Sequence, residues 1–203
     1  HCGEDRIALR WIAADGRLET YSFEDLREMS ARMAAVLRDA GVQPGDVVAG
    51  LLPRTPDLVA TVLGAWRLGA AYQPLFTAFG PKAIEHRLTT AATRLVVTDT
   101  ANRGKLDGIA DCPQVAVVLK EGETAPDGDI DLRAAMAAAP AEFAPVQRGA
   151  DDLMMMMSTS GTTGLPKGVP VPMRALLAFA AYMRDAVDLR AGDTFWNIAD
   201  PGW

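Results

Sequence analysis

Cysteine and histidine are scarce in this chain of 203 residues, which contains two of each. Neither the pair Cys2 and Cys112 nor the pair His1 and His86 has the spacing of metal ligands, so no metal-binding residues are predicted. Two cysteines are also too few for a disulfide framework. This indicates a reducing compartment, and we expect the cytoplasm.

Long apolar runs and an excess of positive charge are also missing. The longest uncharged apolar block, residues 153–157, has the length of a strand and falls far short of the ~20 residues that span a bilayer. The sequence has no basic start followed by an apolar stretch, so it gives no indication of a signal peptide. The 20 Lys and Arg residues are outnumbered by 26 Asp and Glu residues, for a net charge of −6. A protein that grips nucleic acid over a broad face is usually basic, so we predict no nucleic-acid partner and no membrane span.

What the chain does contain favours a packed core. Hydrophobic residues make up 49% of it and charged residues 23%, which excludes disorder as the default state. The length corresponds to one domain or slightly more. Because the chain begins at His1 instead of Met, and stops at Trp203 just past the apolar stretch 195–199, we interpret it as a fragment of a longer protein.

The first forty residues carry hairpin and helix signals. Residues 7–11 and 17–21 flank an Asp-Gly pair, which is typical of a hairpin turn. Ser22 is the expected N-cap of a helix, with Asp25 close to a capping-box position. The helical spacing of apolar residues then continues to Gly41, the predicted stop.

The rest of the chain alternates short apolar strands with helices. Continuous apolar strands separated by helices indicate a parallel sheet that is covered on both faces. We therefore predict an α/β fold, with helices layered on a mostly parallel sheet. The expected strands are 47–52, 95–98, 115–119 and 154–157, and the expected helices are 56–68, 83–88, 103–109 and 132–138.

The stretch from Met154 to Val169 carries the clearest chemical signal. An apolar strand leads into five hydroxyl residues, three glycines and one lysine. Glycines let backbone N–H groups approach an anion closely, hydroxyls add donors, and a lysine adds a compact positive charge. This combination fits a polyphosphate. The residues concerned are Ser158, Thr159, Ser160, Gly161, Thr162, Thr163, Gly164, Lys167 and Gly168.

Two known glycine-rich patterns, the Walker A pattern and G-x-G-x-x-G, do not fit this stretch. Lys167 follows Pro166 and precedes Gly168, so the Walker A pattern fails at its second glycine and at its magnesium-binding hydroxyl. This argues against a kinase-like or GTPase-like module. A flexible surface loop is the other alternative. It is disfavoured because the stretch lies between a buried strand and an ordered Pro-Lys-Gly exit.

Residues 158–168 closely resemble the phosphate-binding signature of adenylate-forming enzymes, the family of acyl-CoA synthetases, luciferases and peptide-synthetase adenylation domains. Segments 20–26, 41–47 and 63–75 resemble the family's N-terminal segments, in the family's order. The segment 195–203, Phe-Trp-Asn-Ile-Ala-Asp-Pro-Gly-Trp, is similar to the acetyl-CoA synthetase and medium-chain branch. One departure is Met173, which stands where many members carry a histidine.

The resemblance implies a two-step ligase that converts a small-molecule carboxylate to an acyl-adenylate and then to an acyl-CoA. We expect the carboxylate to be a short- or medium-chain fatty acid. ATP, Mg²⁺ and coenzyme A would take part. The phosphates of ATP would be held by residues of the loop, with Lys167 also catalytic because it stabilises the departing pyrophosphate. The implied phosphate contacts are Thr159, Ser160, Gly161, Thr162, Thr163, Gly164 and Lys167.

Four further residues outside the loop can be interpreted from the sequence. At an expected strand-to-helix turn, 102–105, the resemblance implies that Arg103 and Lys105 contact the phosphates of coenzyme A; an ordinary solvated basic turn is the alternative. The resemblance also implies that Trp203 lines the acyl pocket; the alternative is that Trp203 is a tryptophan packed in the core. His86, on a predicted helix, is interpreted as a partly exposed or core histidine and not as a catalytic one.

The family's later motifs cannot lie in a chain that stops at Trp203. We therefore expect residues 1–203 to be a partial N-terminal AMP-binding domain that lacks the rest of the large domain and the C-terminal lid, and to be inactive or nearly so when isolated. An apolar face left uncovered would favour association into a homo-oligomer. The alternatives are a relative that adenylates aryl or amino acids, and a nucleotide-binding module without catalysis.

Overall fold

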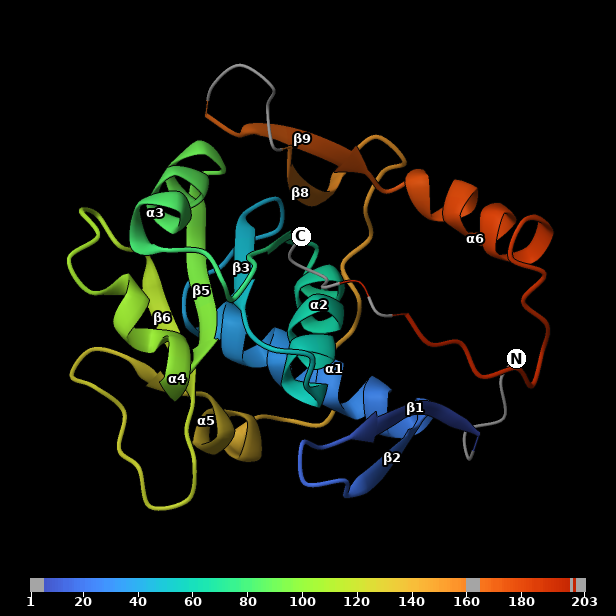
Figure 1. Cartoon of the computed structure of the whole chain (residues 1–203), viewed down its shortest axis with the longest axis horizontal. Coiled ribbons are helices and arrows are strands. Elements are labelled where there is room, and N and C mark those ends of the chain that lie inside the picture. Colours follow the sequence, from blue (N-terminus) through green and yellow to red (C-terminus); the bar gives the residue numbers. More distant parts are fainter. Residues whose placement is uncertain (1–5, 160–164, 198, 200–203) are drawn as a thin grey trace.

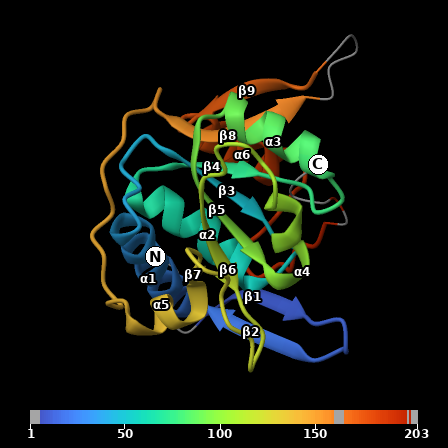
Figure 2. The same cartoon turned by 90° about the vertical axis from the view of Figure 1, so that its left-hand side faces the viewer.

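The computed structural model describes residues 6–159, 165–197 and 199. They form a two-stranded hairpin and a seven-stranded sheet covered by helices (Figure 1). The hairpin pairs β1 (Ile7–Ile12) with β2 (Leu18–Ser22) in antiparallel register, as predicted. In Figure 2 it lies at the opposite end of the molecule from the strands β8 (Leu153–Thr159) and β9 (Lys167–Pro172).

The predicted capping box begins helix α1 (Phe23–Asp39). The Ser22 hydroxyl accepts from the backbone N–H of Asp25 at 3.0 Å, and the Asp25 carboxylate accepts from the backbone N–H of Ser22 at 2.7 Å. Two N–H groups at the start of the helix are thereby satisfied. The helix ends at Asp39 with Ala40 as its C-cap, and Gly41 follows with a φ of +85°, a conformation that favours glycine.

The large sheet is parallel except at one edge. Its strand order is β7-β6-β5-β3-β4-β8-β9, and only the β8–β9 pair among the described strands of this sheet is antiparallel. This confirms the predicted α/β fold with a mostly parallel sheet. The other strands are β3 (Val47–Leu51), β4 (Ala71–Pro74), β5 (Thr93–Asp99), β6 (Gln114–Val118) and β7 (Ile130–Asp131).

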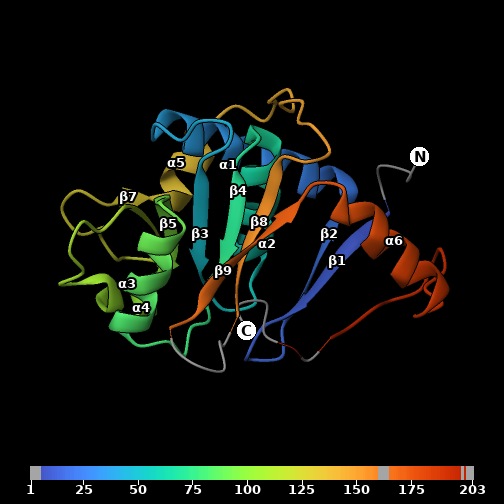
Figure 3. The ribbon, with the colours of Figure 1, turned by 90° about the horizontal axis from the view of Figure 1, so that it is seen from above.

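Helices cover both faces of this sheet (Figure 3). One face packs against α1, α2 (Pro56–Leu68) and α5 (Leu132–Ala138), through a core that includes Val48, Leu95 and Val97. The other face packs against α3 (Pro81–Thr90), through a core that includes Ala49 and Val96. Neighbouring residues of one strand thus serve opposite cores, as the two-residue period of a strand requires.

One helix differs from its predicted position. The sequence predicts a helix over 103–109 and a strand-to-helix turn at 102–105, but α4 already begins at Thr100 and ends at Arg103, and a 3₁₀ turn covers Gly104–Leu106. The cause is Asp99, whose carboxylate accepts from the backbone N–H of Asn102 at 2.9 Å and starts the helix directly after β5. The turn prediction is therefore wrong.

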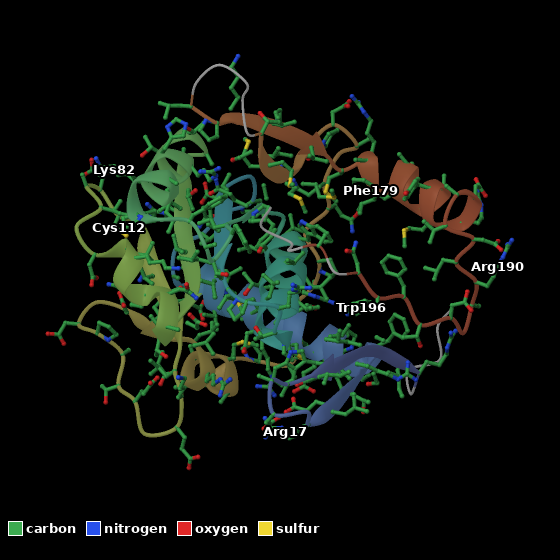
Figure 4. All side chains as sticks on the ribbon, in the orientation of Figure 1. Arg17, Lys82, Cys112, Phe179, Arg190 and Trp196 are labelled. Atoms are coloured by element: carbon green, nitrogen blue, oxygen red, sulfur yellow. The ribbon has the colours of Figure 1, made fainter. Side chains whose placement is uncertain are left out.

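Helix α6 (Ala175–Asp185) lies apart from both cores and has no buried residue. Its apolar side chains Leu177, Phe179 and Tyr182 are exposed, and Figure 4 shows Phe179 on this outlying helix. Within the described residues, no helix is both long and apolar enough to cross a bilayer.

Candidate functional site

The predicted phosphate-binding loop leaves the sheet at β8 and returns at β9. These strands pair so that Thr159 faces Lys167 and Ser158 faces Gly168. The Thr159 hydroxyl reaches the backbone carbonyl of Lys167 at 3.5 Å. The antiparallel register therefore brings the two ends of the loop side by side at the sheet edge (Figure 1).

Five of the predicted phosphate contacts, and the predicted acyl contact Trp203, lie outside the described residues. The five are Ser160, Gly161, Thr162, Thr163 and Gly164. Of the proposed set, the structure places Thr159 and Lys167, and both are exposed to solvent. Within the described part of the chain the Lys167 ammonium has no ion-pair partner. An exposed ammonium without a carboxylate partner keeps its charge available to an anion.

Sequence reasoning missed the contact between this loop and helix α3. The His86 ring nitrogen Nε2 lies 2.8 Å from the backbone carbonyl oxygen of Pro166, the residue before Lys167. His86 is half-buried, which agrees with the structural interpretation made from the sequence. No signal in the sequence pairs residue 86 with residue 166, because the two meet only when α3 is laid over the sheet edge.

Helix α3 is itself held by a buried polar network. The Gln73 side chain donates to the carbonyl of Arg87 at 2.9 Å and accepts from the Thr93 hydroxyl at 2.7 Å. The Arg87 guanidinium lies 3.9 Å from the centre of the Phe79 ring, and burial lowers its pKa. Buried polar groups that satisfy one another fix a unique packing, so α3 is a rigid support for the loop exit.

The two cations predicted to meet coenzyme A already have protein partners. Arg103 forms ion pairs with Asp129 and Asp107, and the ammonium of Lys105 donates to the backbone carbonyl of Thr77 and to the side-chain amide oxygen of Asn102. The hydrogen bond to Asp129 holds the pKa of Arg103 above its ordinary value. The structure places both residues after β5 and brings neither to a described residue of the β8–β9 loop in any ion pair or hydrogen bond.

Two further expectations from the sequence concern Met173 and metal binding. Met173, at the expected histidine position, is half-buried, and its backbone N–H donates to the carbonyl of Asp152 at 2.9 Å. The described residues contain no group of three or more His, Cys, Asp or Glu side chains arranged to hold a metal ion.

A cavity of about 470 Å³ opens between the hairpin and the start of α2. Trp11, Leu58 and Trp196 contribute apolar lining, and Arg10 contributes a charge; Trp196 is labelled in Figure 4. The indole N–H of Trp11 donates to the carbonyl of Arg54 at 2.9 Å, which fixes one wall. No described residue of β8 or β9 lines this cavity, so it is separate from these two strands.

The comparisons with known proteins agree with this architecture. An acyl-CoA synthetase of Brucella canis is 66% identical, superposes with a TM-score of 0.96, and is matched over 99% of this chain and 37% of its own. Acetoacetyl-CoA synthetase of Streptomyces lividans gives a TM-score of 0.89 at 26% identity, over 98% of this chain and 33% of its own. Among curated proteins, the mitochondrial acyl-coenzyme A synthetase ACSM5 of Mus musculus is 34% identical over 97% of this chain.

The fold and the loop at its edge place this chain among α/β proteins of the adenylate-forming kind. The model of the AMP-binding enzyme family matches residues 2–203, so the chain belongs to that family. It spans about a third of the length of the curated relatives it matches, with 34% of both the mouse protein and an acetyl-coenzyme A synthetase of Syntrophus aciditrophicus covered.

Proposed function

We propose that the protein carrying this chain joins a carboxylic acid to coenzyme A at the expense of ATP. In the first step a carboxylate oxygen attacks the α-phosphorus of ATP, the bond to the β-phosphate breaks, and pyrophosphate leaves. In the second step the thiol of coenzyme A loses its proton and attacks the acyl carbon, and AMP leaves with the electron pair of the broken bond. The acid is proposed to be a short- or medium-chain fatty acid; two of the relatives are named an acyl-coenzyme A synthetase and an acetyl-coenzyme A synthetase.

The observation that carries this proposal is the pairing of Thr159 with Lys167. It brings Thr159, with its hydroxyl, and Lys167, whose ammonium has no ion-pair partner among the described residues, side by side at the base of one loop. A polyphosphate is bound by such hydroxyl donors and cations. Lys167 is proposed to neutralise charge on the β- and γ-phosphates. Its electrostatic interaction with these phosphates is proposed to become stronger as pyrophosphate departs. Such an interaction lowers the barrier of the chemical step as well as binding ATP.

Mg²⁺ is proposed to arrive with ATP. Mg²⁺ binds mainly through substrate phosphates and retained waters, with one or two protein ligands. The described residues offer the Thr159 hydroxyl near the loop and no cluster of carboxylates, so no step is assigned to a metal held by the protein alone. Arg103 and Lys105 are proposed to contact coenzyme A, and Trp203 is proposed to line the acyl pocket.

The test is carboxylate-dependent exchange of pyrophosphate into ATP, measured on the whole protein with a panel of fatty, aryl and amino acids. Lys167→Ala is expected to lose about 10²-fold in exchange rate, the usual cost of removing one transition-state donor. Lys82→Ala, which removes an exposed lysine of α3, serves as the matched control and is expected to keep the activity; Figure 4 labels this lysine.

The panel separates the alternatives. Exchange only with aryl or amino acids would move the protein to another branch of its family, and ATP binding without exchange would indicate a binding module. ATP hydrolysis that needs no carboxylate would overturn the proposal in favour of a kinase-like or GTPase-like activity. That residues 1–203 alone show no exchange stays a prediction, to be tested in a separate assay.

Two lesser predictions complete the proposal. We infer a homo-oligomer from the exposed apolar side chains of α6, such as Leu177, and light scattering of residues 1–203, compared with the whole protein, tests it. We also infer a reducing cytoplasm from the scarcity of cysteine; the described Cys112 is a free thiol. Localisation of a tagged copy tests the second inference.

A further inference from the structure

The residue that closes the phosphate loop is tied to a helix 80 positions away. The carbonyl oxygen of Pro166 can only accept, so Nε2 of His86 carries the hydrogen in their 2.8 Å contact. Proline has no N–H, which leaves this carbonyl as the only backbone polar group of residue 166. The bond therefore acts on the one backbone handle that Pro166 offers, directly before Lys167.

The strand that follows needs such a tie. β9 is the last strand in the sheet order and pairs with β8 alone among the described strands. Two of its six residues are Pro170 and Pro172, which donate no hydrogen bond to the ladder. An edge strand whose ladder lacks two donors is held by fewer hydrogen bonds than an inner strand, so a contact from outside the sheet adds to what sets the position of Lys167.

The packing at Gly168 brings helix and strand close enough for this contact. A Cβ at Gly168 would lie 3.2 Å from the sulfur of Met156 and 3.5 Å from the Cγ2 of Thr90. Thr90 is on α3 one turn after His86. Helix and strand thus approach through a glycine directly after Lys167, while His86 bonds to the residue directly before it. Lys167 is bracketed by two contacts to the same helix.

We propose that His86 is a positioning residue that fixes the backbone at Lys167 and so aims the ammonium at the phosphates of ATP. This inference rests on the proposed function for its consequence in catalysis. His86 itself is not proposed to contact substrate. It acts through Pro166 on the direction in which Lys167 leaves the sheet edge, and α3 provides the rigid base.

The test compares two substitutions of His86 in the whole protein. In His86→Gln, the side-chain amide places an N–H near the position of Nε2, whereas His86→Ala removes the donor. We expect His86→Ala to lower kcat/KM for ATP about tenfold in the pyrophosphate exchange assay, as for the loss of one hydrogen bond with its acceptor left half-buried. His86→Gln is expected to recover most of this loss. Thr89→Ala, an exposed change on the same helix, is the matched control.

A double substitution distinguishes positioning from general damage. If His86 acts through Lys167, then His86→Ala added to Lys167→Ala costs no further exchange activity. If it acts through the stability of the fold, the two losses multiply. Multiplying losses, or equal losses in His86→Gln and His86→Ala, would overturn the proposal.

A second measurement needs no turnover. Amide hydrogen exchange over residues 165–172 is expected to be faster in His86→Ala than in the wild type and to return toward the wild-type rate in His86→Gln. Unchanged amide exchange in His86→Ala would overturn the tie itself. If the wild type shows no carboxylate-dependent exchange while the amide pattern appears as expected, the proposed function fails and the tie between α3 and the loop exit stands.

Discussion

Asp129 holds Arg103 by two oxygens of one carboxylate. Nε of Arg103 donates to Oδ2, and Nη2 donates to Oδ1 at 3.2 Å. The Asp129 side chain is only 6% exposed and that of Arg103 is 19% exposed. Because little water screens this pair, it fastens α4 to the loop before β7 more firmly than a surface ion pair would.

The first prediction concerns the stability that this pair provides. Asp129→Ala leaves the Arg103 guanidinium without its buried partner and is expected to lower the free energy of unfolding by about 2 kcal/mol, measured by urea denaturation. Asp107→Ala removes the other carboxylate on Arg103, which is 72% exposed, and is expected to cost no more than about 0.5 kcal/mol. Equal losses in the two variants would contradict the ranking by burial.

The second prediction separates coenzyme A binding from this structural role. Replacing Arg103 and Lys105 together by alanine is expected to raise the KM for coenzyme A by about tenfold, because two cations are lost, while the KM for ATP stays unchanged. Asp129→Asn weakens the ion pair but keeps both cations, so it should leave the KM for coenzyme A unchanged or lower it. A rise in the KM for ATP alone in the double variant would count against the proposed coenzyme A site.

The ease of prediction differed between residues for physical reasons. The start of α1 was predictable from Ser22 and Asp25 because a capping box is a local pattern. Helix α2 was predictable from Pro56 and from the helical spacing of apolar residues over 56–68. The strands β4 and β9 were not predicted. β4 has four residues, one of them glutamine, and β9 contains two prolines that only an edge position tolerates.

The site was less predictable than the fold because its contacts are long-range. The loop was visible as a local run of hydroxyls and glycines, and its strand β8 was visible as an apolar block. The bond from His86 to Pro166 spans 80 residues, and that from Arg103 to Asp129 spans 26. Such contacts depend on which helix covers which strand, and no local pattern encodes them.

The third prediction concerns the crossing of α1 and α2. A Cβ at Gly64 would lie 2.3 Å from the Cγ of Met33, so the helices approach through a position without a side chain. Gly64→Ala is expected to lower the free energy of unfolding by about 1–3 kcal/mol, because overpacking outweighs the roughly 1 kcal/mol that alanine gains in helix propensity. Gly104→Ala is the matched control: its Cβ would meet only Asp107, at 3.8 Å, and its φ of −61° suits alanine. Thermal or urea unfolding of both variants checks the difference.

The fourth prediction concerns the pH dependence that Tyr21 introduces. Burial, and secondly the hydrogen bond that its hydroxyl donates to Glu19 at 2.6 Å, raise the pKa of Tyr21 to about 12. Because the folded state holds this proton more tightly than the unfolded chain, the stabilisation is complete below a pH of about 10 and is lost as the pH rises toward about 12. Tyr21→Phe has no proton to lose, so the stability difference between wild type and variant should shrink over that interval, by at most about 3 kcal/mol. Tyr182→Phe, at a side chain that is 59% exposed, is the control in urea denaturation from pH 9 upward. If the stability difference between wild type and Tyr21→Phe stayed constant over this interval, the Tyr21 hydroxyl would hold its proton no more tightly in the folded protein than in the unfolded chain.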